Sequence, residues 1–275
     1  MRWDVDKQHM ERNGPGTQDG ADGLRTLAIA LETVKSLQRM NGATVTELQQ
    51  RMNLSKSAIY NHLNTLQEHG FVVKNGETYE LGLMFILLGE FVREENDLYS
   101  VGRDPIEALA EAIGYTAHLV TEQHHNRIEL TVARGDKAVG RRFSSVYDPL
   151  DFHTSASGKV MLSFVDDETR EAILAKHGLP ERTSNTITDR ETLEDELETV
   201  REQGYAINDE EEMGGLRGLA APIKGQDDTV EGAVSISAPV GSVSEEQLHN
   251  EIAEQVIQTA NVIQLDLNME RRRDT

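Results

Sequence analysis

The stretch NLSKSAIYNHLNTLQEHGFV, residues 53–72, decides how the N-terminal part of this chain folds. Ser55 is a natural N-cap, and Ile59 and Leu63 lie one turn apart, so the stretch predicts a short helix with one buried face. Gly70 is placed to end that helix, and the face opposite the apolar positions carries polar side chains. This combination is typical of a helix that reads DNA.

Two further helices and a hairpin are expected around this stretch. Residues 24–41 have helical periodicity, and their apolar stripe consists of Leu24, Leu27, Leu31 and Val34. Thr44 and Glu47 form a capping box for a second helix, and Asn75-Gly76 between β-prone runs predicts a two-stranded wing. Three helices followed by a wing predict a winged helix-turn-helix over residues 23–82. A small helical domain that binds nothing is the alternative.

Charge distinguishes this segment from the rest of the chain. The 275 residues carry a formal charge of −21, which by itself argues against binding a polyanion. Residues 24–75, however, contain six Lys or Arg against three Glu, a net charge of +3, which leaves −24 for the remainder. Acidic residues are therefore concentrated away from the expected DNA surface, as a phosphate-binding segment requires.

The composition also bears on the environment of the protein. Only eight of the 27 basic residues are lysine, and an acidic, lysine-poor surface stays solvated in concentrated salt. We therefore expect a salt-adapted cytoplasm, with an ordinary acidic bacterial protein as the alternative. The chain has no cysteine and no apolar run of about 18 residues, so disulfides and a membrane partner are not expected. Residues 1–22 lack the apolar core of a signal peptide and are expected to form a disordered arm.

The second half of the chain predicts a different architecture. Residues 83–101 form an apolar helix that is expected to link two domains and to pair with a second copy; a buried helix of a monomer is the alternative. Asp104-Pro105 predicts the start of the next helix. Over residues 102–270, strand patterns alternate with helical ones, and Ser244-x-x-Gln247 caps a closing helix. This mixture predicts one α+β domain.

The sequence offers little for catalysis. HTSASGK (residues 153–159) contains serines and a histidine but no glycine elbow, so nucleophilic catalysis by Ser155 or Ser157 is not favoured. The acidic run at residues 209–212 is better explained as a solvated loop than as a cation site. We predict no enzyme and no cofactor.

Histidines do not indicate a metal site either. His118, His124 and His125 have no second cluster with ligand spacing. Adjacent histidines in a strand point to opposite faces, so a hairpin tip at His124-His125 is the preferred interpretation. No metal is expected.

Two glycine-containing segments point instead to ligand binding. HTSASGKVML (residues 153–162) places small residues at a helix start, where free amides can hold an anion. NDEEEMGGLRGLAAPI (residues 208–223) places a glycine-rich loop before a strand, and Ser235 and Ser237 fall on one face of a later strand. Exposed amides and hydroxyls suit a small polar ligand or a carboxylate.

The chain resembles the IclR family of transcriptional regulators from about residue 24 to 268. The motifs that carry the resemblance are LSKSAIYNHLNTL, YELGLMFILLG, HTSASGKVML and GYAINDEEEMGGLRGLAAPI followed by AVSISAP. The resemblance implies an α+β chain with an N-terminal winged helix-turn-helix, a linker helix and a C-terminal GAF-like effector-binding domain. With the lysine-poor acidity, it leads us to expect a source among the salt-loving archaea.

The resemblance also implies partners. Family members bind double-stranded DNA as homodimers, or as dimers of dimers, and a near-palindromic operator follows from that symmetry. They respond to a small metabolite, frequently a carboxylate, and we expect this chain to control catabolic genes. An enzyme, or a non-catalytic sensor that acts through protein partners, is the alternative class.

Residues expected to contact DNA lie on the reading helix, the wing and the nearby phosphate-facing surface: Arg25, Thr44, Arg51, Ser55, Lys56, Ser57, Tyr60, Asn61, Lys74 and Asn75. Asn61 stands where the family often has an arginine. Because Asn prefers the adenine edge and Arg the guanine edge, a distinct operator is predicted. For Tyr60, packing inward is the alternative.

The resemblance places effector contacts at Ala156, Ser157, Asn208, Leu216, Gly218, Ser235 and Ser237. Many members have an aspartate in place of Asn208 and a cysteine in place of Gly218. Loss of the carboxylate removes a group that would repel an anion, and loss of the cysteine side chain enlarges the pocket. We therefore expect a ligand larger than a two-carbon acid, such as a sugar acid.

Overall fold

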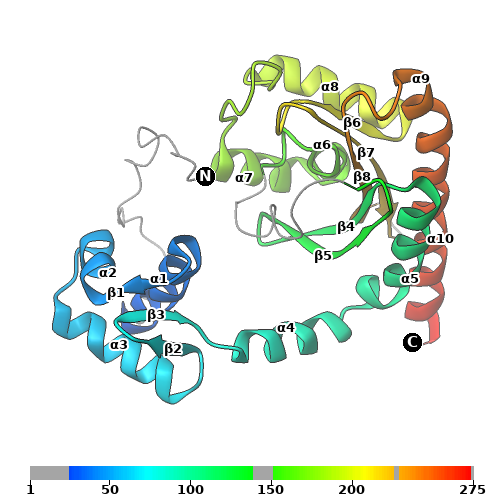
Figure 1. The fold of residues 1–275 in the computed structure, drawn as a ribbon. Coiled ribbons are helices and arrows are strands. Elements are labelled where there is room, and N and C mark those ends of the chain that lie inside the picture. The colour runs from blue at the N-terminus through cyan, green and yellow to red at the C-terminus, as the bar shows by residue number, and fades with distance from the viewer. Residues whose placement is uncertain (1–24, 139–150, 226–228, 274–275) are drawn as a thin grey trace. The chain divides into compact units, whose positions relative to one another are not determined.

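The computed structural model describes residues 25–138, 151–225 and 229–273, and the chain divides into two compact units, residues 1–85 and 86–275 (Figure 1). The arm expected at residues 1–22 lies outside the described residues. The first unit consists of α1 (Arg25–Met40), β1 (Ala43–Thr44), α2 (Val45–Met52), α3 (Lys56–Glu68), β2 (Val72–Asn75) and β3 (Thr78–Leu81). Its strands form an antiparallel sheet in the order β1-β3-β2.

Local signals in the sequence build this unit. The capping box is present: the Thr44 hydroxyl accepts from the Glu47 amide at 3.3 Å, and the Glu47 carboxylate accepts from the Thr44 amide at 2.8 Å. Ser55 caps α3 by accepting from the Ala58 amide at 3.2 Å. Asn53 lies in the left-handed region (φ 52°), which allows the tight turn between α2 and α3. The winged helix-turn-helix is confirmed.

The core of the first unit contains Leu37, Leu48, Ile59 and Leu63. The apolar stripe of α1 lies outside this core, since Leu27 and Leu31 are 59% and 54% exposed. The side chains that α1 buries are Thr33, Ser36 and Leu37. An apolar stripe that the unit does not bury is available to a partner.

The second unit is built on a five-stranded sheet. After α4 (Met84–Glu94), which crosses the boundary between the units, it comprises α5 (Asp97–Ile113), β4 (Thr116–Gln123), β5 (Asn126–Arg134), α6 (Ala156–Phe164), α7 (Asp167–His177), α8 (Arg190–Gln203), β6 (Ala206–Asp209), β7 (Leu216–Lys224), β8 (Val230–Pro239), α9 (Glu245–Gln247), a π-helical turn (Leu248–Ile252) and α10 (Ala253–Arg273). The strands are antiparallel in the order β5-β4-β8-β7-β6. The α+β class is confirmed.

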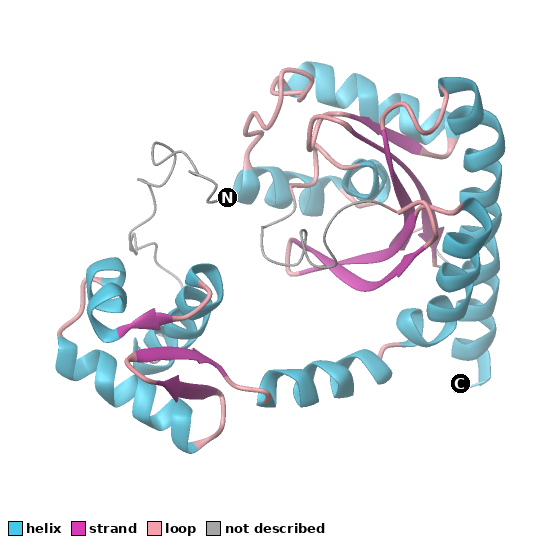
Figure 2. Ribbon diagram, viewed as in Figure 1, coloured by secondary structure: helices cyan, strands magenta, loops and turns pink. Residues whose placement is uncertain are grey.

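Helices cover both faces of this sheet (Figure 2). Leu119, Leu219 and Ile236 pack with α5 and α10 in one core cluster. Val120 and Ala220 pack with α6, α7 and α8 in another. Because side chains alternate along a strand, His118 and Gly218, two positions before Val120 and Ala220, also face α6, as do Ser235 and Ser237, which follow Ala233 of the same cluster by two and four positions.

The prediction of one helix over residues 83–101 is wrong. Asn96 interrupts it: its side chain accepts from the Tyr99 amide at 2.9 Å and so caps a new helix, α5, that begins at Asp97. Asp104 therefore caps nothing, and Pro105 lies inside α5 instead of at its first position. The earlier start places Leu98 and Tyr99 in the first turn of α5, where both side chains are buried. Their burial favours a helix that begins at Asp97.

Apolar side chains on and beside α4 are exposed. The group consists of Leu83, Ile86, Leu87, Leu88, Phe91 and Val92, which are between 45% and 76% exposed. No residue of the described helix α4 is buried. A contiguous apolar surface of this kind marks an interaction site.

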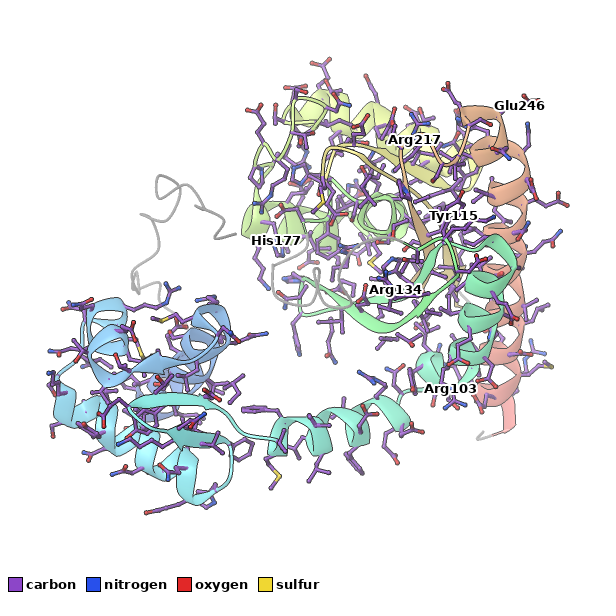
Figure 3. All side chains as sticks on the ribbon, in the orientation of Figure 1. Arg103, Tyr115, Arg134, His177, Arg217 and Glu246 are labelled. Atoms are coloured by element: carbon purple, nitrogen blue, oxygen red, sulfur yellow. The ribbon has the colours of Figure 1, made fainter. Side chains whose placement is uncertain are left out.

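The hairpin tip at His124-His125 is confirmed. Both residues have positive φ, 53° and 60°, as a two-residue turn between β4 and β5 requires. His177 lies on α7 (Figure 3). Its Nε2 donates to the carbonyl of His125 at 2.6 Å and so ties the tip to that helix.

Candidate nucleic-acid interface and effector site

The face of α3 that is turned away from the core of its unit carries the predicted reading residues. Lys56, Ser57, Tyr60 and Asn61 are all exposed, and Tyr60 is 41% exposed, so it does not pack inward. Ser55 is exposed as well, although its hydroxyl is engaged as the cap of α3. The geometry offers one lysine, one amide and two hydroxyls on a single helix, which is a suitable set for base edges and phosphates.

The wing and the flanking basic residues are also accessible. Lys74 and Asn75 end β2 in exposed positions, and the Lys74 ammonium lies 5.4 Å from the centre of the Tyr79 ring. Arg25 and Arg51 are exposed at the start of α1 and in the last turn of α2. Thr44 is only partly exposed, because its side chain participates in the capping box.

The predicted effector residues of the second unit meet on the α6 side of the sheet. Asn208 lies opposite Gly218 in the ladder, and Gly218 lies opposite Ser237. A Cβ added at Gly218 would lie 3.8 Å from the Asn208 Cβ and 3.9 Å from the Ala156 Cβ, so these residues share one small space. Leu216 and Ser235 lie two positions away on the same face of their strands.

The start of α6 is buried. Ser155 is the N-cap and its hydroxyl accepts from the Gly158 amide at 3.1 Å. The amides of Ala156 and Ser157 belong to the first turn and have no carbonyl partner within the helix. Ala156 and Ser157 are 4% and 1% exposed, so the start of this helix is sheltered from solvent.

Asn208 has a mainly structural role in this structure. Its side-chain oxygen accepts from the amides of Glu211 at 2.9 Å and Glu212 at 3.4 Å, which holds the turn that follows β6. An aspartate here could accept the same bonds but would add a negative charge.

Sequence reasoning missed a row of polar side chains that joins His118 on β4 to Glu129 on β5 and Ser237 on β8. His118 Nδ1 lies 2.8 Å from Glu129 Oε2, and His118 Nε2 lies 3.1 Å from Ser237 Oγ. Strand alternation would have placed His118 and Glu129 on one face, but only the pairing of β4 with β8 brings Ser237 beside them. Ser237 is in a regular ladder rather than on a strained turn, which does not suit a nucleophile.

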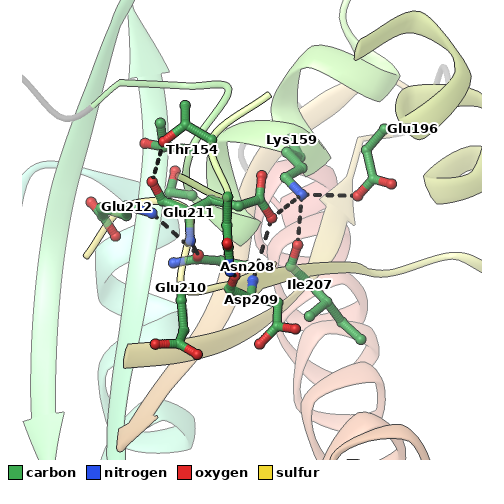
Figure 4. A network of polar contacts seen from close by, with 12 residues as sticks. Thr154, Lys159, Glu196, Ile207, Asn208, Asp209, Glu210, Glu211 and Glu212 are labelled. Carbon is green, nitrogen blue, oxygen red and sulfur yellow. Dashed lines mark hydrogen bonds and ion pairs between the residues drawn. The ribbon is translucent and has the colours of Figure 1, made fainter. Parts of the chain in front are cut away.

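Lys159 is the centre of a buried ion network (Figure 4). Its ammonium donates to Glu211 at 2.7 Å, to Glu196 at 2.9 Å and to the carbonyl of Ile207 at 2.8 Å. The Lys159 side chain is 2% exposed and that of Glu211 is 9% exposed. The network fastens α6 to α8 and to the acidic turn after β6.

The acidic run is therefore not simply a solvated loop, as the sequence suggested. Asp209 is exposed, whereas Glu211 points inward to Lys159. Burial raises the pKa of Glu211, although the Lys159 ammonium acts in the opposite direction. Its second carboxylate oxygen, Oε2, is buried without a partner in the described part of the chain.

The described residues contain neither a membrane-spanning helix nor a metal-binding cluster. Over residues 25–138, 151–225 and 229–273, no helix combines the length and apolar character needed to cross a membrane. Within the same ranges, no group of three or more His, Asp or Glu side chains is arranged to hold a metal ion.

A winged helix-turn-helix followed by an α+β domain with a sheltered polar site defines a class of DNA-binding regulators. Residues 26–76 match the IclR helix-turn-helix domain, and residues 91–265 match the C-terminal domain of the bacterial transcriptional regulator IclR. The chain belongs to the IclR family.

Individual relatives support the same assignment. The chain is 36% identical to the probable HTH-type transcriptional regulator ArcR of Halobacterium salinarum, over 89% of this chain and 94% of that one. It is 33% identical to the HTH-type transcriptional regulator KdgR of Escherichia coli, over 84% and 89% of the two chains. The crystal structure of an IclR transcriptional regulator from Alicyclobacillus acidocaldarius matches with a TM-score of 0.78 and 27% identity, over 89% and 99%.

These relatives are transcriptional regulators, and the chain is a transcriptional regulator rather than an enzyme. Its helix-turn-helix domain binds DNA, and its C-terminal domain is the effector-type domain of the family. The similarity to a Halobacterium salinarum protein supports a source among the salt-loving archaea.

Proposed function

We propose that this regulator binds double-stranded DNA through α3 and changes its DNA affinity when a small carboxylate binds beside α6. The observation that carries the proposal is the sheltered start of α6. There, two amides have no partner within the helix, and Ala156 lies beside Gly218, which is opposite Ser237 in the ladder, with Ser235 two positions away on the same face. The amides and the Ser235 hydroxyl are the donors that a carboxylate needs, and burial strengthens their interaction with it.

The shape of the site favours an acid larger than two carbons. A Cβ at Gly218 would lie 3.0 Å from the carbonyl oxygen of Ile236 and 3.8 and 3.9 Å from the Cβ atoms of Asn208 and Ala156, so glycine leaves room here that a larger residue would fill. In the neutral imidazole, Nδ1–H donates to Glu129, so Nε2 accepts the Ser237 proton and leaves the Ser237 oxygen as an acceptor. The Ser237 oxygen can therefore accept a hydrogen bond from a hydroxyl of the ligand. The proposed ligand is a sugar acid or a related hydroxy acid.

The DNA-bound form is a homodimer that pairs through exposed apolar surface on α1 and α4, with Leu27, Leu31, Leu87 and Phe91 among the exposed side chains. Two copies place two reading helices about 34 Å apart, so the operator is a near-palindrome. Light scattering of the purified chain distinguishes a dimer from a dimer of dimers. The protein acts in the cytoplasm, and catabolic genes for the acid are its targets.

A gel shift with the DNA upstream of the protein's own gene tests the function directly. The titration is run at several salt concentrations, with and without a panel of hydroxy acids and keto acids. We expect one acid to change the affinity by a coupling free energy of about 1–3 kcal/mol. Equal affinity with every acid would contradict ligand response, and absence of sequence-specific binding would contradict the DNA-reading role.

Asn61 provides a test of base reading. Because asparagine pairs with the adenine edge, we expect Asn61→Arg to shift the preference at one position of each half-site from adenine to guanine, by about 1–3 kcal/mol. Binding to a set of operators with single base changes measures the shift. A uniform loss of affinity for all operators would show that Asn61 only supports the backbone contacts.

A further inference from the structure

Arg127 on β5 is a buried cation whose donors are incompletely satisfied. Its side chain is 8% exposed, and Nε is buried without a partner in the described part of the chain. Nη1 donates to the Ser157 hydroxyl at 2.5 Å. The carboxylate of Glu212 lies 3.4 Å from Nη2, a long contact, and Glu212 itself is 28% exposed.

Other carboxylates near Arg127 are engaged elsewhere. Glu129 pairs with His118 at 2.8 Å, and Asp151 pairs with Arg182 at 2.5 Å. A guanidinium is suited to two parallel hydrogen bonds to one carboxylate, and among the described residues Arg127 has no such partner. A buried charge without close pairing is costly, so its retention needs a reason other than stability.

The position of Arg127 supplies that reason. Its guanidinium contacts Ser157, the second residue of the nine-residue helix α6, and therefore lies beside the helix start. The amides of Ala156 and Ser157 and the positive end of the helix dipole are directed to the same place. A cationic side chain and a helix N-terminus that converge in a sheltered site attract an anion together.

We propose that Arg127 is the cationic anchor of the effector, holding its carboxylate against the N-terminus of α6. The inference rests on the proposed function, because it assumes that the α6 side of the sheet is the ligand site. It adds a residue outside the set that the family resemblance identified, and it restricts the ligand to an anion with two accepting oxygens. The incoming carboxylate replaces the long contact of Arg127 with Glu212.

Binding is measured by thermal shift and calorimetry on the full chain, in concentrated potassium chloride. The probes are gluconate, pyruvate and 4-hydroxybenzoate, each compared with its neutral amide. We expect an acid to bind and its amide not to bind. Arg127→Met should weaken binding of that acid at least tenfold, as loss of a charged hydrogen bond implies, and Arg127→Lys should weaken it less. Arg103→Met, which changes a solvent-exposed arginine on α5, is the matched control and should bind as the unmodified chain does.

A second variant separates anchoring from a purely structural role. Glu212→Gln removes the carboxylate that competes for Arg127, so it should tighten acid binding if Arg127 is the anchor. If Arg127 serves only to pair with Glu212, then Glu212→Gln should lower stability without tightening any acid. This variant remains informative if Arg127→Met does not fold.

The outcomes distinguish the two proposals. Undiminished acid binding by a folded Arg127→Met chain overturns the anchor and leaves the proposed function intact. A chain that no acid stabilises, and whose DNA affinity no acid changes, overturns the proposed function itself. Equal binding of an acid and its amide overturns the anchor alone, because a neutral ligand has no need of a cation.

Discussion

The two sites of this regulator differ in how their residues are held. On α3, Lys56, Tyr60 and Asn61 are exposed, and the helix is fixed by side chains on its opposite face. Beside α6, the candidate contacts Ser157 and Asn208 are buried, and each makes hydrogen bonds to other protein groups.

This difference follows from the two ligands. DNA is larger than the unit that reads it and brings its own surface, so reading residues can remain solvated until binding. A small acid must be enclosed, so the groups around it have to be ordered by other groups that never touch it. Substitutions of the buried residues around the start of α6 should therefore lower stability first. Substitutions on the exposed face of α3 should weaken DNA binding and leave stability unchanged.

The largest effect is expected at Lys159. Lys159→Ala leaves Glu211 buried without its cation and should lower the free energy of unfolding by about 3–5 kcal/mol. Denaturant unfolding followed by circular dichroism measures the loss. Lys35→Ala on α1, at an exposed position, is the control and should change stability by less than about 0.5 kcal/mol.

The double variant Lys159→Met with Glu211→Gln tests the cause. Because it removes both charges, it should recover most of the stability that Lys159→Ala loses. If the double variant is as unstable as the single one, packing rather than charge explains the loss. Loss of packing, and not loss of a buried ion pair, would then distinguish the buried site from the exposed one.

Gly158 should have the next largest effect. A Cβ there would lie 2.1 Å from the carbonyl oxygen of Phe152, so Gly158→Ala must push the start of α6 away from that backbone. We expect a loss of about 1–3 kcal/mol and a weaker response to the effector, because the amides of Ala156 and Ser157 move with the helix. Gly214→Ala is the control, since its Cβ would meet nothing within 4 Å. Equal stability of the two variants would contradict this prediction.

Short-range signals in the sequence predicted much of the fold. The Thr44–Glu47 capping box, the hairpin of the wing and the His124-His125 tip each depend on a few neighbouring residues, although the turn of the wing is formed by Gly76-Glu77, one residue later than the predicted Asn75-Gly76, because Asn75 pairs with Thr78. The start of α5 was mispredicted because two N-cap signals, Asn96 and Asp104, lie within one segment. Burial of Leu98 and Tyr99 decided between them, and burial is a tertiary property.

The candidate site was predicted only in part, for a similar reason. Motif position indicated the start of α6 and the strand serines, because those lie in recognisable runs. The Lys159–Glu211 pair joins residues 52 positions apart, and the Arg127–Ser157 contact joins residues 30 positions apart. An isolated arginine in a strand, or one glutamate in an acidic run, has no local signal that shows it to be buried.

On α3 the expected effect is on binding alone. Lys56→Ala should leave the unfolding curve unchanged, since Lys56 is exposed, but should weaken DNA binding and reduce the slope of log affinity against log salt by about 1. A gel-shift titration at four salt concentrations measures the slope. Lys137→Ala, at an exposed position of the second unit, is the control with the same change of charge. An unchanged slope would remove Lys56 from the set of phosphate contacts.

The smallest effect is a pH dependence that only the buried side of the comparison should show. Burial lowers the pKa of His153 below its ordinary value of 6.5, and His153 Nε2–H donates to the carbonyl of Pro180 at 3.1 Å. The unfolded chain therefore takes up a proton before the folded chain does. The stability that neutral His153 contributes is present above pH 6.5 and is lost as the pH falls through the lowered folded-state value.

His153→Gln keeps a donor but cannot titrate, so its stability should fall less than that of the unmodified chain on acidification below pH 6.5. Denaturant unfolding at pH 8, about 6 and about 5 compares the two chains. Glu211 cannot produce the same trend: its raised pKa gives stability that is present below about 4.5 and lost as the pH rises. Parallel pH profiles for the two chains would show that His153 is protonated equally in the folded and unfolded states.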